Sequence, residues 1–314
     1  MNYPISITCS LITALVCASI SAQEQKPITN NILYLDFAHT SKNLVAVGEQ
    51  GTIILSEDNG ANWITASTPI KPLLTSVFFI NENVGWAVGH QSTVLKTING
   101  GSKWEISKTN IKESALFDVY FSDPDHGVAI GAFGSFYRTR NGGKSWRKEK
   151  QMSGDKHLYK IRKIHNTHYA IIGEKGLMLR SNNLEEWHQV KLPTSNNLLN
   201  ITSNGNDILI VGTRGTIIQS ENAGKTWNNI PPVSIAALQA AATLSDEKIL
   251  IGGSKGTLHI LEAGQKKYSQ IFFGKFETIT SITQLPNSEL VFTGKFGIRK
   301  SPVNMTYLTI ENDE

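Results

Sequence analysis

Cysteine is almost missing from this sequence, and its placement is informative. The 314 residues contain only Cys9 and Cys17, both inside an apolar and small-residue run from Ile5 to Ile20 that carries no charged side chain. The run is shorter and more polar than the about 20 residues of a membrane-spanning helix, and small residues before position 23 provide a cleavage site. We therefore expect residues 1–22 to be a signal peptide, removed on export to the periplasm or another extracytoplasmic compartment. Residues 23–314 then form a cysteine-free mature domain, which suits an oxidising environment.

Signals of nucleic-acid binding and of common catalytic sites are also missing. The formal charge of +4 falls short of the dense Lys/Arg content of nucleic-acid binders, so no nucleic-acid partner is expected. The sequence has no H-E-x-x-H motif, and its G-x-x-G pairs precede no helix that could hold a phosphate. His165 and His168 come nearest to metal-ligand spacing but flank a predicted hairpin turn. No metal and no cofactor are predicted.

What the sequence does contain is a repeat. A G-x-x-G pair followed by a strand-like segment recurs every 39 to 42 residues, and a tryptophan follows it in the first five copies, with Tyr268 in the sixth. The first glycines of the copies are Gly48, Gly89, Gly131, Gly173, Gly212, Gly253 and Gly294. A period of about 40 residues is typical of a propeller blade.

Each copy predicts four strands. A partly alternating strand lies upstream, a continuously apolar strand precedes the first glycine, a third strand follows the glycine pair, and a fourth begins near the tryptophan. Partial alternation indicates one buried face, and a continuous apolar run indicates burial on both faces. The sequence therefore predicts an all-β fold, a seven-bladed β-propeller of four-stranded blades that fills residues 23–314 as a single domain.

A polar turn precedes the repeat tryptophan of the first five copies, with the pattern Ser/Thr-x-Asp/Asn-x-Gly-x-x-Trp in all but the fourth, which is one residue shorter and lacks the glycine. Its Asp or Asn can accept backbone N–H bonds across the turn, its glycine can take a positive φ, and its tryptophan can pack between neighbouring sheets. We expect a structural role for the acid or amide of these turns, namely Asp58, Asn99, Asn141, Asn183 and Asn222.

This turn resembles the Asp box, or bacterial neuraminidase repeat, of sialidases and several other propellers. The longer pattern, a D-V-x-F strand, a G-W-A-V-G strand and T-x-[DN]-G-G-x-x-W, stands at Leu116–Phe121, Gly85–Gly89, Thr97–Trp104 and Thr139–Trp146. In that form the chain resembles the photosystem II assembly and stability factor family over nearly all of its mature length. The resemblance implies a seven-bladed propeller outside the cytoplasm that binds a protein partner. The lipoprotein signal typical of cyanobacterial members is missing, because Val16 stands where lipid attachment at Cys17 needs a small residue.

The alternative is a glycan-binding or glycoside-hydrolase propeller of the sialidase type. Sialidases need an arginine cluster, a Tyr–Glu pair and an acidic proton donor, and their Arg-Ile-Pro segment is absent here. Asp36 and Asp118 on inner strands are the remaining candidate carboxylates, although polar residues lining a wet central channel would look the same. We expect no enzyme activity. Convergence of Asp36 and Asp118 on an open cleft would instead favour the glycan-processing alternative.

Partner-binding residues are predicted in two sets. The middle residues of the G-x-x-G turns should ring one face, where Lys175, Arg214, Lys255 and Lys295 form a positive arc with Phe133 and Phe296 as exposed aromatics, the residue type enriched where proteins bind. The second set, Lys96, Arg138 and Arg180, lies on blades 2 to 4 and matches the arginine-rich patch that the family resemblance implies. These basic side chains could instead cover apolar strand surface with their stems. The sequence thus predicts a monomeric, non-enzymatic scaffold or assembly factor for a membrane-protein complex of the cell envelope.

Overall fold

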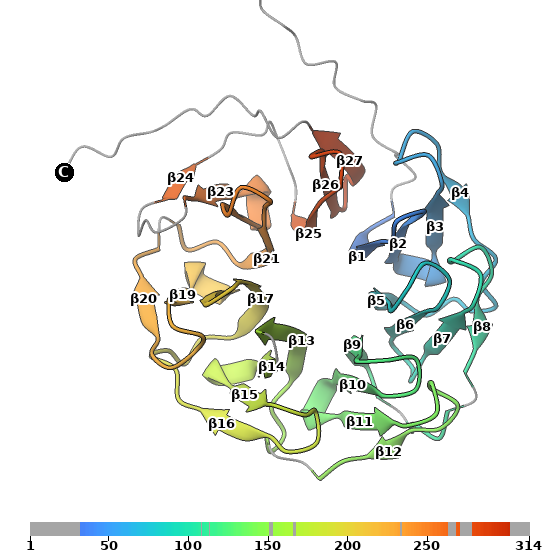
Figure 1. The fold of residues 1–314 in the computed structure, drawn as a ribbon, viewed down its shortest axis with the longest axis horizontal. Coiled ribbons are helices and arrows are strands. Elements are labelled where there is room, and N and C mark those ends of the chain that lie inside the picture. Colours follow the sequence, from blue (N-terminus) through green and yellow to red (C-terminus); the bar gives the residue numbers. More distant parts are fainter. Residues whose placement is uncertain are drawn as a thin grey trace, which may run out of the picture.

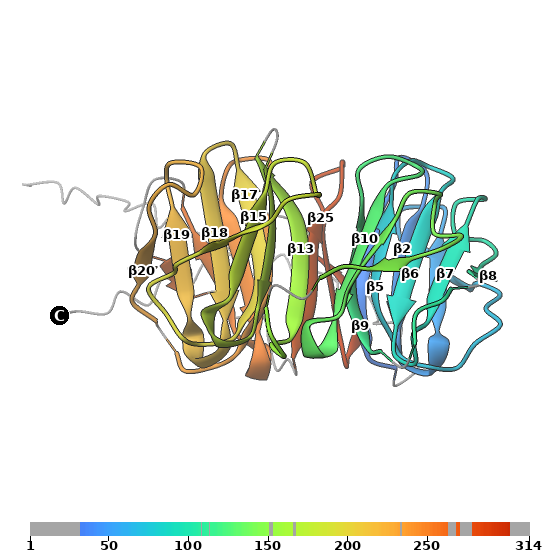
Figure 2. The ribbon, with the colours of Figure 1, turned by 90° about the horizontal axis from the view of Figure 1, so that it is seen from below.

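Seven antiparallel sheets surround a common axis in the computed structural model (Figure 1). The structure describes residues 32–301 except 108, 113, 151–152, 166–167, 233, 263–267 and 271–277. Figure 2 shows the sheets from the side, with their strands running across the thickness of a disc. No helix within the described part of the chain is long and apolar enough to cross a membrane. The predicted signal peptide, Cys9 and Cys17 lie outside the described residues.

Each blade is an up-and-down sheet whose strands follow the chain from the axis outward. The inner strands are β1 (Tyr34–His39), β5 (Leu74–Phe79), β9 (Leu116–Phe121), β13 (Leu158–His165), β17 (Leu198–Asn204), β21 (Leu238–Thr243) and β25 (Ile279–Gln284). The second strands are β2 (Leu44–Gly48), β6 (Gly85–Gly89), β10 (Gly127–Gly131), β14 (His168–Gly173), β18 (Asp207–Gly212), β22 (Ile249–Gly253) and β26 (Leu290–Gly294).

The outer half of each blade follows a short turn. The third strands are β3 (Ile53–Ser56), β7 (Val94–Thr97), β11 (Phe136–Thr139), β15 (Met178–Ser181), β19 (Ile217–Ser220), β23 (Leu258–Leu261) and β27 (Gly297–Ser301). The fourth strands are β4 (Ile64–Thr65), β8 (Glu105–Ile106), β12 (Arg147–Lys148), β16 (His188–Val190), β20 (Asn228–Ile230) and β24 (Tyr268–Gln270). The turns between second and third strands include five 3-10 elements: η1 (Glu49–Gly51), η2 (Ala132–Gly134), η3 (Glu174–Gly176), η4 (Thr213–Gly215) and η5 (Ser254–Gly256).

The predicted propeller is confirmed, and its strands lie where the repeat places them. Every residue of β2, β6, β10, β22 and β26 is buried, as their continuous apolar sequences predict. Blade 7 has three strands within the described residues, β25, β26 and β27. The other six sheets have the predicted four strands.

The hydrophobic core lies between blades rather than inside any one of them. Val45 and Leu55 of blade 1 pack with Leu74 and Trp104 of blade 2 in one cluster, and the pattern repeats around the ring. A further cluster joins blade 1 to blade 7 and closes the disc. Because a single blade cannot cover its own apolar faces, the ring is stable only when neighbours stack.

The Asp-box turns have the geometry predicted for them. In the first, Asp58 accepts the Asn62 N–H at 2.8 Å, and the Ser56 hydroxyl accepts the Gly60 N–H at 2.7 Å. The backbone N–H of Asn62, its side-chain amide and the Ser56 hydroxyl all donate to the Asp58 carboxylate and lower its pKa to about 2. Equivalent side-chain to backbone bonds are made by Asn99, Asn141, Asn183 and Asn222. The structural role predicted for these residues is confirmed.

Blade 6 carries a buried histidine that should make stability pH-dependent. His259 is 2% exposed and pairs with Ile251, at the place that Ile54, Leu95 and Ile218 take in other blades. Burial lowers its pKa to about 4. Below pH 6.5, the His259 side chain binds a proton in the unfolded chain but stays neutral in the folded protein. The free energy of unfolding therefore falls as the pH falls toward 4.

We expect wild-type protein to lose about 2 kcal/mol more than His259→Leu between pH 7 and pH 5, at about 1.4 kcal/mol per pH unit below 6.5. Leucine suits the site because the equivalent residues are apolar. Urea unfolding of both proteins at the two pH values measures the difference. Parallel pH profiles would show that His259 does not titrate as its burial requires.

Candidate functional site

One face of the disc carries the G-x-x-G turns, and we call it the turn face. In blade 1 the Glu49 N–H donates to the Leu33 carbonyl just before the inner strand, at 3.0 Å. The first glycine, Gly48, has an extended φ of −170°, but a Cβ there would lie 2.1 Å from the same carbonyl oxygen. Close approach therefore requires this glycine. The second, Gly51, has the predicted positive φ, 68°.

The second middle residue of each 3-10 turn is held in a left-handed conformation that directs its side chain to solvent. Lys175, Arg214 and Lys255 take this place, with φ of 56°, 57° and 59°, and all three are exposed. Lys295 is exposed as well, but it lies in a shorter hairpin in which Gly294 pairs with Gly297. Lys175 lies 3.7 Å from the carboxylate of Glu174, which partly offsets the positive charge at blade 4. The four basic residues are separate positive charges spaced over blades 4 to 7.

The turn face also carries a cluster of aromatic rings between blades 3 and 4. Phe133 is 69% exposed with φ of 51°, and its N–H donates to Nδ1 of His157 at 3.0 Å. The two ring centroids lie 4.9 Å apart, and Phe117 stacks on Tyr159 at 5.8 Å. His157 also contacts both of these rings, at 6.0 Å. We call Phe117, Phe133, His157 and Tyr159 the aromatic cluster. Burial raises the pKa of the Tyr159 phenol.

The prediction that Phe296 is an exposed aromatic is wrong. Phe296 is half-buried and packs against the core between blades 6 and 7. A Cβ on Gly294 would lie 2.6 Å from its ring, and the Arg299 guanidinium lies over the same ring at 5.3 Å. The shorter turn of blade 7 folds the ring back onto its own glycine. Phe133 is thus the exposed aromatic of the turn face among the predicted residues.

The second predicted set joins blades to each other. Lys96 donates to the Gly142 carbonyl at 3.0 Å and lies over the Trp86 ring. Arg138 is 7% exposed and donates to the Leu184 carbonyl at 2.7 Å, and Arg180 reaches the Gly224 carbonyl at 3.5 Å. Burial lowers the pKa of both Lys96 and Arg180. Each side chain therefore bonds to the next blade's Asp-box turn, which favours the structural interpretation.

Lys300 is a fourth member of this set, which the spacing of the internal repeats does not predict. It donates to the Asn59 carbonyl at 2.6 Å and pairs with Glu289, so it joins blade 7 to blade 1. Its strand partner Val291 corresponds to Trp86, the partner of Lys96. The turn between the second and third strands of blade 7 is one residue shorter than in the other blades. Lys300 therefore lies one residue nearer to the first glycine of its repeat than Lys96 does.

Asp36 and Asp118 do converge, but in a buried network. The Ser76 hydroxyl lies 2.7 Å from Oδ2 of Asp36 and 2.5 Å from Oδ1 of Asp118. Asp118 is fully buried and also accepts the Ile161 N–H at 2.8 Å and pairs with Arg162 at 2.9 Å. Asp36 is 5% exposed. Both carboxylates are thus occupied by hydrogen bonds and ion pairs, and they do not face each other across an open cleft.

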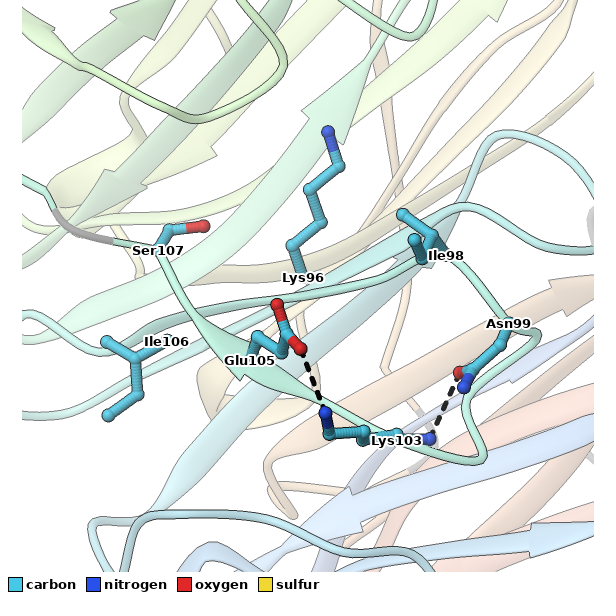
Figure 3. Close-up of a pocket in the computed structure, with 7 residues that line it drawn as sticks. All are labelled: Lys96, Ile98, Asn99, Lys103, Glu105, Ile106 and Ser107. Atoms are coloured by element: carbon cyan, nitrogen blue, oxygen red, sulfur yellow. Dashed lines mark hydrogen bonds and ion pairs between the residues drawn. The ribbon is translucent and has the colours of Figure 1, made fainter.

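A pocket of about 180 Å³ lies on the outer edge of blade 2 (Figure 3). Lys96 points away from Glu105, whose carboxylate is bound by Lys103 at 3.0 Å. Exposed Ile98 and Ile106 line the remainder. No catalytic set converges in this pocket. Within the described residues no group of three or more His, Cys, Asp or Glu side chains could hold a metal ion.

Comparison with known proteins agrees with this geometry. The family model for "Photosynthesis system II assembly factor YCF48" matches residues 103–192. No curated protein matches the chain in sequence. A structure of YCF48 bound to a D1 peptide is 18% identical with a TM-score of 0.73, covering 87% of this chain and 94% of its own. YCF48 from Cyanidioschyzon merolae is 15% identical with a TM-score of 0.74, covering 89% and 98%.

The propeller fold itself is shared more widely. Virginiamycin B lyase from Staphylococcus aureus is 12% identical with a TM-score of 0.75, covering 88% of this chain and 97% of its own. Such likeness shows the fold alone, since one propeller scaffold serves unrelated functions. The residues matched by the family model run from the last turn of blade 2 through blades 3 and 4. The resemblance predicted from that repeat is confirmed: residues 103–192 match the family model of a photosystem II assembly factor, and the fold of the chain is similar to that of YCF48.

Proposed function

We propose that this protein is an exported, non-enzymatic scaffold that binds a protein of the cell envelope through its turn face. The partner is a membrane-protein complex or one of its subunits during assembly. A relative that binds a D1 peptide supports a peptide segment as the ligand. The network that occupies both inner carboxylates supports a role other than glycoside hydrolysis.

The observation that carries this proposal is Phe133. Its left-handed conformation is shared by the equivalent residue of the other 3-10 turns, but at blade 3 the residue is a phenylalanine. Here it places a ring that is 69% exposed on a turn where glycine would fit without strain. Exposed aromatics are enriched among the residues that dominate protein interfaces. The half-buried, stacked rings of Phe117 and Tyr159 add apolar surface beside Phe133.

The test begins with fractionation of native cells and proximity cross-linking from a photo-reactive residue at position 133. We expect the protein in the periplasmic fraction, joined to one defined envelope protein. Phe133→Gly should weaken the affinity for that protein by about tenfold or more, the loss of a 1.4 kcal/mol contact. Stability should stay within about 1 kcal/mol, because glycine tolerates the turn. Cytoplasmic location, or hydrolysis of sialosides or β-glucans by pure protein, would overturn the proposal.

The positive arc of the turn face gives a second prediction. Reversing two exposed charges, Arg214→Glu with Lys255→Glu, should weaken capture of the same partner and reduce its salt sensitivity, because these charges attract an acidic surface over about 8–10 Å. The melting temperature should barely change, since exposed substitutions rarely exceed about 0.5 kcal/mol. Binding titrations at two salt concentrations measure both effects.

The matched control is Lys144→Glu with Lys225→Glu, which changes the net charge equally but lies in exposed Asp-box turns on the opposite face. Equal weakening by both double variants would indicate that net charge, rather than the turn face, governs binding.

A further inference from the structure

A polar cavity of about 300 Å³ lies among the inner strands of blades 1, 4, 5, 6 and 7. Figure 1 shows these strands, β1, β13, β17, β21 and β25, side by side around the axis. The cavity is separate from the turn-face residues discussed above and is lined by the middle and later parts of each inner strand. Its walls differ in charge, which makes it a candidate binding site.

One wall, formed by β13, is positively charged. Lys160, Arg162 and Lys163 all line the cavity. Lys160 lies 3.7 Å from each of Asp36 and Asp118, between the two buried carboxylates. Lys163 is exposed, and no ion pair involves it within the described residues. The two carboxylates are thus balanced by Lys160 and Arg162, which leaves Lys163 as an excess positive charge.

Arg162 uses only one side of its guanidinium. Its Nη1 donates to Asp118 at 2.9 Å and to the Ile161 carbonyl at 2.7 Å. No hydrogen bond from Nε or Nη2 is present within the described residues, and one third of the side chain is exposed. The Nε–Nη2 edge is the side that binds a carboxylate or phosphate through two parallel hydrogen bonds. The ion pair with Asp118 fixes the plane in which that edge lies.

Apart from Asp36, the other walls of the cavity are uncharged and rich in hydroxyl groups. Ser203 of β17 and Ser281 and Thr283 of β25 line the cavity here, with Asn200 beside them. These side chains can donate to anionic oxygens without adding charge. Asp36 is the one carboxylate that lines the cavity, and its Oδ2 already accepts from Ser76 and from the Val77 N–H at 3.2 Å.

We propose that this channel cavity binds a small oxyanion, a carboxylate or a phosphate. Nε and Nη2 of Arg162 donate to two oxygens of the anion, and Lys163 supplies the balancing charge. The hydroxyl groups of Ser203, Ser281 and Thr283 donate to the remaining anionic oxygens. The anion is either a free small molecule or an acidic side chain inserted by a partner. The inference does not depend on the docking face proposed above.

The experiment titrates the whole protein with inorganic phosphate and with succinate in low-salt buffer, by calorimetry and by thermal shift. We expect saturable binding with a dissociation constant below about 10 mM. Lys163→Gln should weaken it about fivefold or more, and Arg162→Lys about tenfold, because lysine keeps the charge beside Asp118 but loses the two-bond edge. Lys255→Gln, on the exposed turn face, is the matched control and should bind like wild type.

A second arm separates the two sources of the anion. A capped peptide with a single glutamate is compared with the same peptide carrying glutamine. Binding of the free anions identifies a small-molecule ligand, and binding of the glutamate peptide alone, lost in Lys163→Gln, identifies a partner's side chain. Failure of phosphate, succinate and the glutamate peptide to bind wild type would overturn the proposal. So would binding that Lys255→Gln weakens as much as Lys163→Gln does.

Discussion

Replacing Trp146 by alanine is expected to lower the free energy of unfolding by about 3–5 kcal/mol, the range found when large aromatics are removed from packed cores. Trp146 is 1% exposed and packs in the cluster between blades 2 and 3. Its ring meets Phe121 edge-on at 6.0 Å, and Phe121 in turn stacks on Trp86 at 3.5 Å. The substitution leaves a cavity at one end of this group of three rings, beside Phe121. Urea denaturation of wild type and variant measures the loss.

Two comparisons show whether packing is the cause. Asp58→Ala, which removes turn hydrogen bonds at the surface, should cost less than Trp146→Ala. Trp104→Phe should cost more than Trp146→Phe, because Trp104 donates to the Gly101 carbonyl at 2.9 Å. The Trp146 indole N–H finds no acceptor within the described residues. If Asp58→Ala were the more damaging change, the turn rather than the ring would be the main anchor of the blade.

The fold could be predicted because the same residue types recur at the same spacing in successive repeats. Each of the first five copies carries a covered strand, a glycine that closely approaches a carbonyl, a capped turn and a tryptophan. Each of these features depends on residues close together in the sequence. A copy in which the pattern is weak can therefore be interpreted from the clearer copies. Blade 7 shows the limit of this reasoning. Its turn changes register, so Phe296 is half-buried rather than exposed, and Lys300 takes the role of Lys96 without the matching spacing.

The candidate sites were harder to predict because they combine residues from different repeats. Phe133 could be found from its turn position, and the exposed position is confirmed. The neighbours Phe117 and Tyr159 could have been noticed as aromatics at the second position of two adjacent inner strands, where the other blades have Leu, Thr or Gln. The repeat spacing places Asp36, Ser76 and Asp118 at equivalent positions of the inner strands of blades 1 to 3, but it does not show that their side chains touch. That contact depends on how neighbouring inner strands meet at the axis.

The Asp118 network gives the second large prediction. Asp118→Ala should cost about 3–5 kcal/mol, because removing one partner of a buried ion pair leaves the other charge uncompensated. The change strands the Arg162 guanidinium and leaves the Ile161 N–H without its acceptor, while Lys160 keeps Asp36 as its remaining carboxylate. Urea denaturation measures the loss. Because the carboxylate is fully buried, added salt should restore little of the lost stability.

The matched variants for this network are Ser76→Ala and Asp246→Ala. Ser76→Ala removes the hydroxyl between the two carboxylates but leaves their three ion pairs with Lys160 and Arg162, so its cost should be smaller. Coupling between Ser76 and Asp118 should then appear in a double-mutant cycle, since residues that share a buried hydrogen bond are not additive. Asp246 pairs with Lys248 at 3.1 Å on the surface, where such pairs contribute about 0–1 kcal/mol. An Asp118→Ala variant no less stable than Asp246→Ala would mean that the inner ring is held by packing of its strands, and that the buried charges serve the channel rather than the fold.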